Sequence, residues 1–176
     1  ELTFAAPSLG AVNVPLSPLL MGPGLRALLA DSQAAALVTQ VSMLPVIESI
    51  RAELSPELHR RIVLVDGAEP GCFSLAELRA VASAEPPRAT VTQDDLFNIM
   101  YTSGTTGLPK GIMHSHYVRA MYALLMGAAW RMTPESVVLH TGAIVFNGAY
   151  TTLMPCFHLG AHYGLDFVGS IALGDA

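Results

Sequence analysis

The chain has 176 residues, about one domain's worth, with a net charge of −5 and an apolar fraction of 52%. Because no basic stripe accompanies this negative charge, a nucleic-acid partner is not expected. The longest apolar helical run, residues 120–130, is shorter than the roughly 20 residues that cross a bilayer, so the sequence predicts no transmembrane segment. Two isolated cysteines, Cys72 and Cys156, lack metal or redox spacing and are typical of reduced thiols in a cytoplasmic protein.

Short apolar runs and helical patterns alternate through the first half of the chain, separated by glycine and proline turns. The predicted strands are residues 11–15, 35–39 and 61–65; the predicted helices end at Asp31, run from Pro45 to Ser55-Pro56, and begin at the capping box Ser74–Glu77. Residues 84–95 contain two adjacent prolines and few apolar side chains. We therefore expect a linker there, inside the domain.

The second half continues the alternation. An apolar run precedes a loop, residues 110–114 are expected to be extended, and Ser115 is a good N-cap for the next helix. The apolar stripe of that helix, assigned to the core, is Val118, Met121, Tyr122, Leu125, Met126 and Ala129; a strand at 137–140, a helix at 147–157 broken by Pro155 and a strand at 161–165 follow. This order indicates an α/β fold with a largely parallel sheet flanked by helices, whose ligands bind beyond the carboxyl ends of the strands.

The most distinctive stretch is the segment 101–111, which reads Tyr-Thr-Ser-Gly-Thr-Thr-Gly-Leu-Pro-Lys-Gly. Glycine lets a ligand approach the backbone closely, so hydroxyl and backbone N–H donors can converge on one anion. Pro109 stiffens the end of the loop, and Lys110 adds a mobile positive charge. The pattern predicts a polyphosphate-binding loop.

The loop does not follow the common nucleotide-binding pattern. A Walker A loop needs a glycine directly before its lysine and Ser or Thr after it, whereas Lys110 lies between Pro109 and Gly111. A surface turn without a ligand is the simpler alternative, since clusters of Ser, Thr and Gly are usually loops. The density of small and hydroxyl residues behind a buried-type strand favours the phosphate-binding interpretation.

All eleven residues resemble the phosphate-binding motif of the adenylate-forming enzymes, a family that includes acyl-CoA synthetases, peptide-synthetase adenylation domains and luciferases. Residues 10–18, Gly-Ala-Val-Asn-Val-Pro-Leu-Ser-Pro, are similar to an earlier segment of the same family. The resemblance extends from about Gly10 to Leu165. It implies that residues 1–176 are part of the family's large N-terminal AMP-binding domain, with the C-terminal domain outside this chain.

The resemblance implies a ligase most like an acyl-CoA synthetase. Its substrates would be ATP, a small-molecule carboxylic acid and coenzyme A, and its metal would be Mg²⁺. The residues assigned by the motif to the ATP phosphates are Thr102, Ser103, Gly104, Thr105, Thr106, Gly107 and Lys110. Lys110 would be catalytic because it stabilises the charge that builds on departing pyrophosphate, and Thr102 would approach the magnesium ion.

Part of the family's acyl pocket corresponds to residues 142–150, which makes Phe146, Asn147 and Gly148 candidates for that pocket. The family often has a histidine in this segment, but Val145 stands at the matching position. The aromatic gate is therefore not identified by the motif. Core packing is an equally good explanation for Phe146 and Tyr150.

Other functions have less support. A non-catalytic phosphate-binding module and an adenylation domain with another thiol acceptor are the remaining alternatives. The pairs His114/His116 and His158/His162 have no cysteine or carboxylate nearby to complete a metal site. No Gly-x-Ser-x-Gly elbow is present, so hydrolase chemistry is unsupported. The sequence specifies neither the acid nor the oligomeric state.

Overall fold

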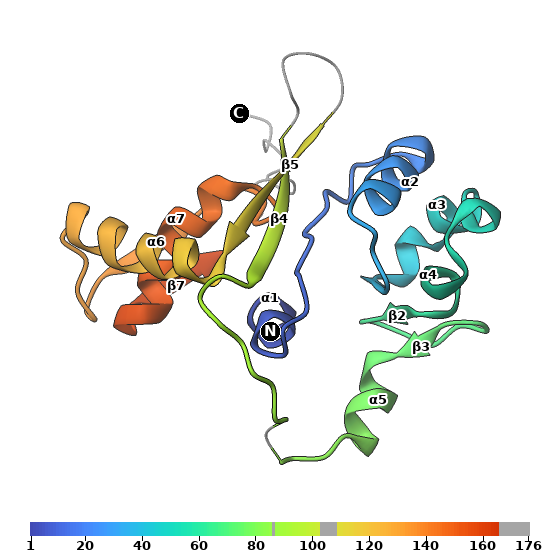
Figure 1. Cartoon of the computed structure of the whole chain (residues 1–176), viewed down its shortest axis with the longest axis horizontal. Coiled ribbons are helices and arrows are strands. Elements are labelled where there is room, and N and C mark those ends of the chain that lie inside the picture. Colours follow the sequence, from blue (N-terminus) through green and yellow to red (C-terminus); the bar gives the residue numbers. More distant parts are fainter. Residues whose placement is uncertain (86, 103–108, 166–176) are drawn as a thin grey trace, which may run out of the picture. The chain divides into compact units, whose positions relative to one another are not determined.

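A computed structural model describes residues 1–85, 87–102 and 109–165. The chain divides into two compact units (Figure 1). One unit is formed by Glu1–Pro15 together with the chain from Ala89 onwards, and the other by Leu16–Arg88. The predicted linker, residues 84–95, spans the point at which the chain passes from one unit to the other.

The unit Leu16–Arg88 contains a three-stranded parallel sheet in the order β1-β2-β3. Its elements are α2 (Gly22–Asp31), β1 (Leu37–Thr39), the 3-10 turn η1 (Val41–Met43), α3 (Leu44–Glu48), η2 (Arg51–Glu53), α4 (Pro56–Arg60), β2 (Ile62–Leu64), β3 (Phe73–Ser74) and α5 (Leu75–Val81). Ile62 and Leu64 of the central strand are completely buried. Ile62 belongs to the same core as Leu25 of α2, Ile47 of α3 and Leu58 of α4, so the helices cover the sheet with apolar side chains.

The described residues of the other unit form two separate two-stranded sheets. Its elements are α1 (Leu2–Ser8), β4 (Leu96–Thr102), β5 (Lys110–Ser115), α6 (His116–Ala129), β6 (Val137–His140), α7 (Asn147–Leu159) and β7 (His162–Leu165). Strands β4 and β5 form an antiparallel hairpin, and β6 and β7 pair in parallel. The packing of α6 against α7 can be followed in Figure 1. No helix among the described residues is both long and apolar enough to cross a membrane.

The alternating order of strands and helices confirms the predicted α/β class. The largely parallel pairing is seen in two of the three sheets of the described chain. The start of the chain differs from the expectation. Residues 11–15 form no named strand, and only Asn13 makes a bridge, to Asn98. A helix that was not predicted, α1, precedes them, and its Phe4 packs edge-on against Phe97 of β4 with ring centroids 6.2 Å apart.

Pro56 and Pro155 were each expected to end or break a helix, but in the structure neither does so. The predicted helix from Pro45 ends early, at Glu48, and Ser55-Pro56 begins α4. The Ser55 hydroxyl accepts a hydrogen bond from the Leu58 amide at 3.2 Å, and Pro56 occupies the first turn. Pro155 lies inside α7 without ending it. A Cβ added to Gly127 of α6 would lie 3.5 Å from the Pro155 Cβ, so the two helices pack closely at the position of the proline.

Helix α6 begins at the predicted cap, where the Ser115 hydroxyl accepts from the Val118 amide at 3.3 Å. Its buried face differs from the predicted stripe. Leu125 is 60% exposed, whereas the buried residues of the helix are Arg119, Ala123 and Gly127. Gly127 on this face lies close to Leu159 and Pro155 of α7, so the side of α6 that carries it is buried against α7.

Candidate functional site

The β4–β5 hairpin carries the two ends of the predicted phosphate loop. Thr102 is paired with Lys110, and Tyr101 with Gly111, in the last two positions of the ladder. Side chains directly opposite each other in an antiparallel pair have Cβ atoms roughly 5 Å apart. Thr102 and Lys110 are both exposed. The sheet therefore holds an oxygen-bearing side chain and a cation together where the loop begins and ends.

The residues between these ends, Ser103, Gly104, Thr105, Thr106 and Gly107, lie outside the described residues. Their role in phosphate binding, and that of Thr102 at a metal, stay predictions. Among the described residues, no group of three His, Cys, Asp or Glu side chains could hold a metal ion. Mg²⁺ in nucleotide enzymes needs few protein ligands, because water and substrate phosphates fill most of its octahedron. The hydroxyl oxygen of Thr102 is a ligand of the type that Mg²⁺ prefers.

Gly111 has a packing role that the sequence did not reveal. A Cβ built at this residue would lie 2.9 Å from Cγ2 of Ile99 and 3.2 Å from Cε1 of Tyr101. The first distance is shorter than real Cβ contacts allow. Glycine at this position therefore lets the Tyr101 ring lie against the opposite strand. The Tyr101–Gly111 pair is next to the last pair of the ladder, Thr102–Lys110.

Arg119 of α6 occupies the centre of a buried polar cluster under the hairpin. Its side chain is 1% exposed. Its Nε donates to Oδ1 of Asn98 at 3.0 Å, its Nη1 donates to Oδ1 of Asn147 at 2.9 Å, and its Nη2 donates to Sδ of Met100 at 3.2 Å. Asn98 and Met100 belong to β4, and Asn147 is the first residue of α7. One guanidinium thus joins three elements.

Two aromatic rings face the same guanidinium. Its Cζ lies 4.3 Å from the centroid of the Tyr150 ring and 5.0 Å from that of Tyr122, which are cation–π distances. Burial lowers the pKa of Arg119 to about 10, and the two tyrosines act in the opposite direction. Arg119 therefore remains charged at neutral pH. Among the described residues, no carboxylate is paired with it.

The acyl-pocket candidates lie at the start of α7 in three different environments. Phe146 precedes the helix and is 55% exposed. Asn147 is half-buried, and its Nδ2 donates to the Tyr122 hydroxyl at 3.2 Å while its Oδ1 accepts from Arg119. Gly148 is exposed, and an added Cβ there would meet no atom within 4 Å. Tyr150 is completely buried, which agrees with the core-packing alternative for that residue.

His114 of β5 is the cross-strand partner of Asn98. Both side chains are buried, and Nδ1 of His114 and Nδ2 of Asn98 are buried atoms without a hydrogen-bond partner in the described structure. Desolvation, with a contribution from the Arg119 charge, holds the pKa of His114 below its ordinary value. The histidine is thus kept neutral beside the arginine.

Sequence reasoning missed the Arg119 cluster. The available signal was an arginine in a helix that is otherwise almost entirely apolar, followed at i+3 by a tyrosine. Arg119 directly precedes the apolar run of residues 120–130, yet the structure buries it more deeply than any leucine of the same helix. Its partners in β4 and α7 are 21 and 28 residues away in the chain, so local patterns could not reveal them.

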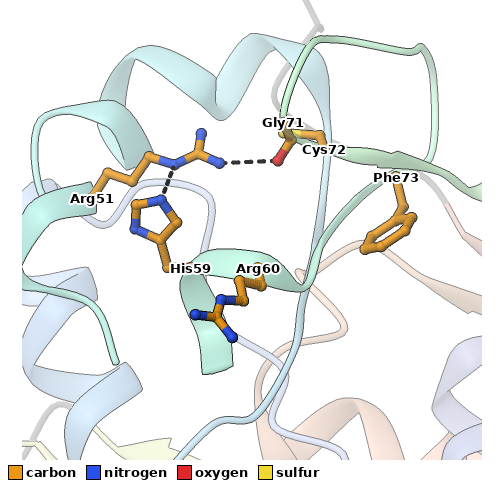
Figure 2. Close-up of a pocket in the computed structure, with 6 residues that line it drawn as sticks. All are labelled: Arg51, His59, Arg60, Gly71, Cys72 and Phe73. Carbon is orange, nitrogen blue, oxygen red and sulfur yellow. Dashed lines mark hydrogen bonds between the residues drawn. The ribbon is translucent and has the colours of Figure 1, made fainter. Parts of the chain in front are cut away.

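Two surface pockets are lined by other residues than those of the Arg119 cluster. One, of about 530 Å³, is lined in part by Phe4, Phe97 and His116. The other, of about 390 Å³, lies in the unit Leu16–Arg88 (Figure 2). In this second pocket Arg51 donates to Nε2 of His59 at 3.4 Å and to the Gly71 carbonyl at 3.0 Å, and it also pairs with Glu48. Arg51 is therefore already engaged by the protein, and Arg60 is the second arginine that lines the pocket.

Comparisons with known proteins agree with the motif. A family model described as AMP-binding enzyme matches residues 1–166. A linear gramicidin synthase protein of Brevibacillus parabrevis is 34% identical over 158 residues, which are 90% of this chain and 2% of that protein. The long-chain-fatty-acid–CoA ligase FadD13 of Mycobacterium tuberculosis is 39% identical over 115 residues, which are 65% of this chain and 22% of FadD13.

A solved structure gives the same result for the fold. The anthranilate CoA ligase AuaEII, crystallised in complex with anthranoyl-AMP, superposes with a TM-score of 0.85 and 30% sequence identity. The match covers 96% of this chain and 32% of the AuaEII chain, so the sequence spans about a third of that enzyme. From the family match over almost the whole sequence and from this likeness, the chain belongs to the AMP-binding enzyme family of adenylate-forming enzymes.

Proposed function

We propose that the protein carrying this chain is an AMP-forming acid–thiol ligase, most like an acyl-CoA synthetase. In the first step a carboxylate oxygen attacks the α-phosphorus of ATP, the bond to the β-phosphate oxygen breaks, and acyl-AMP and pyrophosphate form. In the second step the thiol of coenzyme A releases its proton to solvent and its sulfur attacks the acyl carbon; the bond between that carbon and the phosphate oxygen breaks, and AMP leaves. The observation that carries the proposal is the pairing of Thr102 with Lys110 across the two ends of the hydroxyl-rich loop.

The proposed roles follow from where charge develops. Negative charge grows on departing pyrophosphate, and fixed donors aimed at it stabilise the transition state without having to reorganise. Lys110 would supply the positive charge, and Ser103–Gly107 would supply N–H and hydroxyl donors. Mg²⁺ would neutralise phosphate charge, and Thr102 would hold it with its hydroxyl oxygen. Phe146, Asn147 and Gly148 would border the acyl group.

The named relatives support this class of reaction without fixing the substrate. FadD13 is a long-chain-fatty-acid–CoA ligase, and AuaEII was crystallised with an acyl-AMP. A lipophilic acid fits the apolar character of the segment around Phe146, and a cytoplasmic location remains our prediction. Because the chain spans only 22% of FadD13, we also propose that the remaining contacts to adenine, ribose and the acid come from residues outside it.

The second candidate is an adenylation domain with a different thiol acceptor. It is favoured by the 34% identity to the linear gramicidin synthase protein over 90% of this chain. The two candidates share the first step and differ in the second. A phosphate-binding module without turnover is the third candidate, and it predicts nucleotide binding alone.

Acid-dependent exchange of labelled pyrophosphate into ATP tests the shared step. The full-length protein is incubated with ATP, Mg²⁺ and single carboxylic acids that range from short to long and from aliphatic to aromatic. Exchange with at least one acid supports the ligase, and thioester formation on adding coenzyme A separates the first candidate from the second. Tight ATP binding without exchange for any acid would leave only the module.

A further inference from the structure

Burying the charged side chain of Arg119 is unfavourable in free energy. Removing a charged side chain from water costs several kcal/mol even after the protein relaxes, unless an opposite charge compensates. Here the described partners are two amide oxygens, a thioether sulfur and two aromatic faces, and all of them are neutral. An apolar side chain of similar volume would fill this space at lower cost. Stability alone therefore gives a poor account of the arginine.

The guanidinium is well suited to fixing geometry. It is planar, and its donors point in fixed directions, unlike those of a lysine. Nε and Nη2 contact β4 at Asn98 and Met100, and Nη1 contacts α7 at Asn147. One rigid group thus links two residues of β4 to the first residue of α7 by hydrogen bonds in fixed directions.

These contacts lie next to the two halves of the proposed site. Side chains alternate along a strand, so Asn98 and Met100 share one face of β4 with Thr102, two residues further on. Asn147 is one of the acyl-pocket candidates, and it is followed by Gly148 in the first turn of α7. Arg119 therefore connects the strand that enters the phosphate loop with the helix start that would border the acyl group.

We propose that Arg119 is a positioning residue, which holds the start of α7 in register with β4 and so aligns the acid with the ATP phosphates. This inference rests on the proposed function. Attack on the α-phosphorus requires the two reactants to be aligned, and a misplacement of about 1 Å can lower the rate by roughly 10²-fold. Arg119 itself contacts neither reactant and acts through Asn147 and β4.

The kinetic test compares Arg119→Lys and Arg119→Met with Arg131→Met, a matched control at an exposed arginine just after the same helix. Single-turnover acyl-AMP formation is measured per folded molecule, well below the unfolding temperature of each variant. We expect the maximal rate of both Arg119 variants to lie about 10- to 100-fold below that of wild type, with Arg119→Met slower than Arg119→Lys. The KM for ATP should stay within about twofold of wild type. The control should keep the wild-type rate. Rates within about twofold of wild type in both Arg119 variants would overturn the inference.

A second measurement does not depend on activity. Hydrogen exchange in the full-length protein should accelerate at least about fivefold in peptides covering β4 and the first turn of α7 when Arg119 is replaced by Met, while β2 in the other unit stays unchanged. If Arg119→Met does not fold, Asn147→Ala removes one of the three contacts and should show the same local effect. If wild type makes no acyl-AMP, the proposed function fails, and accelerated exchange in both segments would still support the connection made by Arg119. Unchanged exchange in either segment would overturn it.

Discussion

Thr102 and Lys110 are direct cross-strand partners in the last pair of the β4–β5 ladder. Their separation is therefore set by the sheet and does not depend on the conformation of the loop between them. Backbone alternation places Asn98 and Met100 on the same face of β4 as Thr102, and these two residues are held by Arg119. The sequence motif thus begins and ends on two paired strands.

Lys110 is the only lysine in the 176 residues, which provides a chemical test of its position. If its ammonium lies beside the phosphates, saturating MgATP should slow its acylation by an amine-reactive ester about tenfold or more, because the amine is then both paired and covered. Mass spectrometry of the peptide that contains Lys110 measures the rate. Adenosine, which lacks phosphates, is the control ligand, and equal rates with and without ATP would contradict the assignment.

Thr105 and Thr106 should face a common anion. We expect a crystal structure with an ATP analogue or sulfate to place an anion oxygen within about 3.2 Å of a hydroxyl or backbone N–H of at least one of them. Thr→Val substitution at the contacting residue removes the hydroxyl with little change in volume and should weaken nucleotide binding several-fold. Both hydroxyls packed away from a bound nucleotide would refute this prediction.

Gly111→Ala should destabilise the hairpin. The added Cβ would meet Ile99 at 2.9 Å and Tyr101 at 3.2 Å, and such overpacking costs about 1–3 kcal/mol. Gly148→Ala is the matched control, because a Cβ there meets nothing within 4 Å. Urea unfolding should show a lower free energy of unfolding for the first variant and no loss for the second. Equal stabilities would show that β4 and β5 can separate to admit the methyl group.

Features of the hairpin and of the start of α6 that depend on local sequence were predictable. The strand before the loop, the cap at Ser115 and the extended segment that begins at Lys110 depend on local patterns, and the structure confirms all three. The sequence predicts that the loop glycines admit a ligand, but the packing of Gly111 against Tyr101 depends on a residue ten positions away across the hairpin. Local sequence patterns predict helices and strands, but they do not predict which faces of these elements pack against each other.

The same limit explains the two errors in α6 and α7. The apolar periodicity of α6 predicts that Leu125 is buried, but α6 packs against α7 at Gly127 and buries a different face. Pro155 was expected to break α7, but the helix continues through it. The buried Arg119 is a tertiary feature of this kind. The residues of the candidate site were named from the motif, whereas the group that connects its two halves became visible only in three dimensions.

His114 should make stability depend on pH. Burial and the Arg119 charge hold its pKa below the ordinary 6.5, so the unfolded chain binds more protons than the folded one between the folded pKa and 6.5. Stability therefore rises with pH through this window and falls as pH drops below about 6.5, with a slope of at most about 1.4 kcal/mol per pH unit.

His114→Gln, which keeps a polar side chain without titration, should flatten that part of the stability curve. The measurement is the free energy of unfolding by urea at pH values between about 4.5 and 7.5. His162→Gln, at an exposed position of β7, is the control and should keep the wild-type dependence. An unchanged slope in His114→Gln would mean that His114 contributes no coupling between folding and protonation.

The most direct test of the proposed chemistry is the single-turnover rate of acyl-AMP formation in the full-length protein with Lys110→Ala. With the best acid from the exchange panel, saturating ATP and Mg²⁺, the rate should fall roughly 10²- to 10³-fold, as expected when one fixed charge on a departing oxyanion is removed. Thermal unfolding of the variant should match wild type, because Lys110 is exposed at the end of the hairpin. A wild-type rate of acyl-AMP formation in a normally folded Lys110→Ala protein would contradict the role of this loop in the reaction.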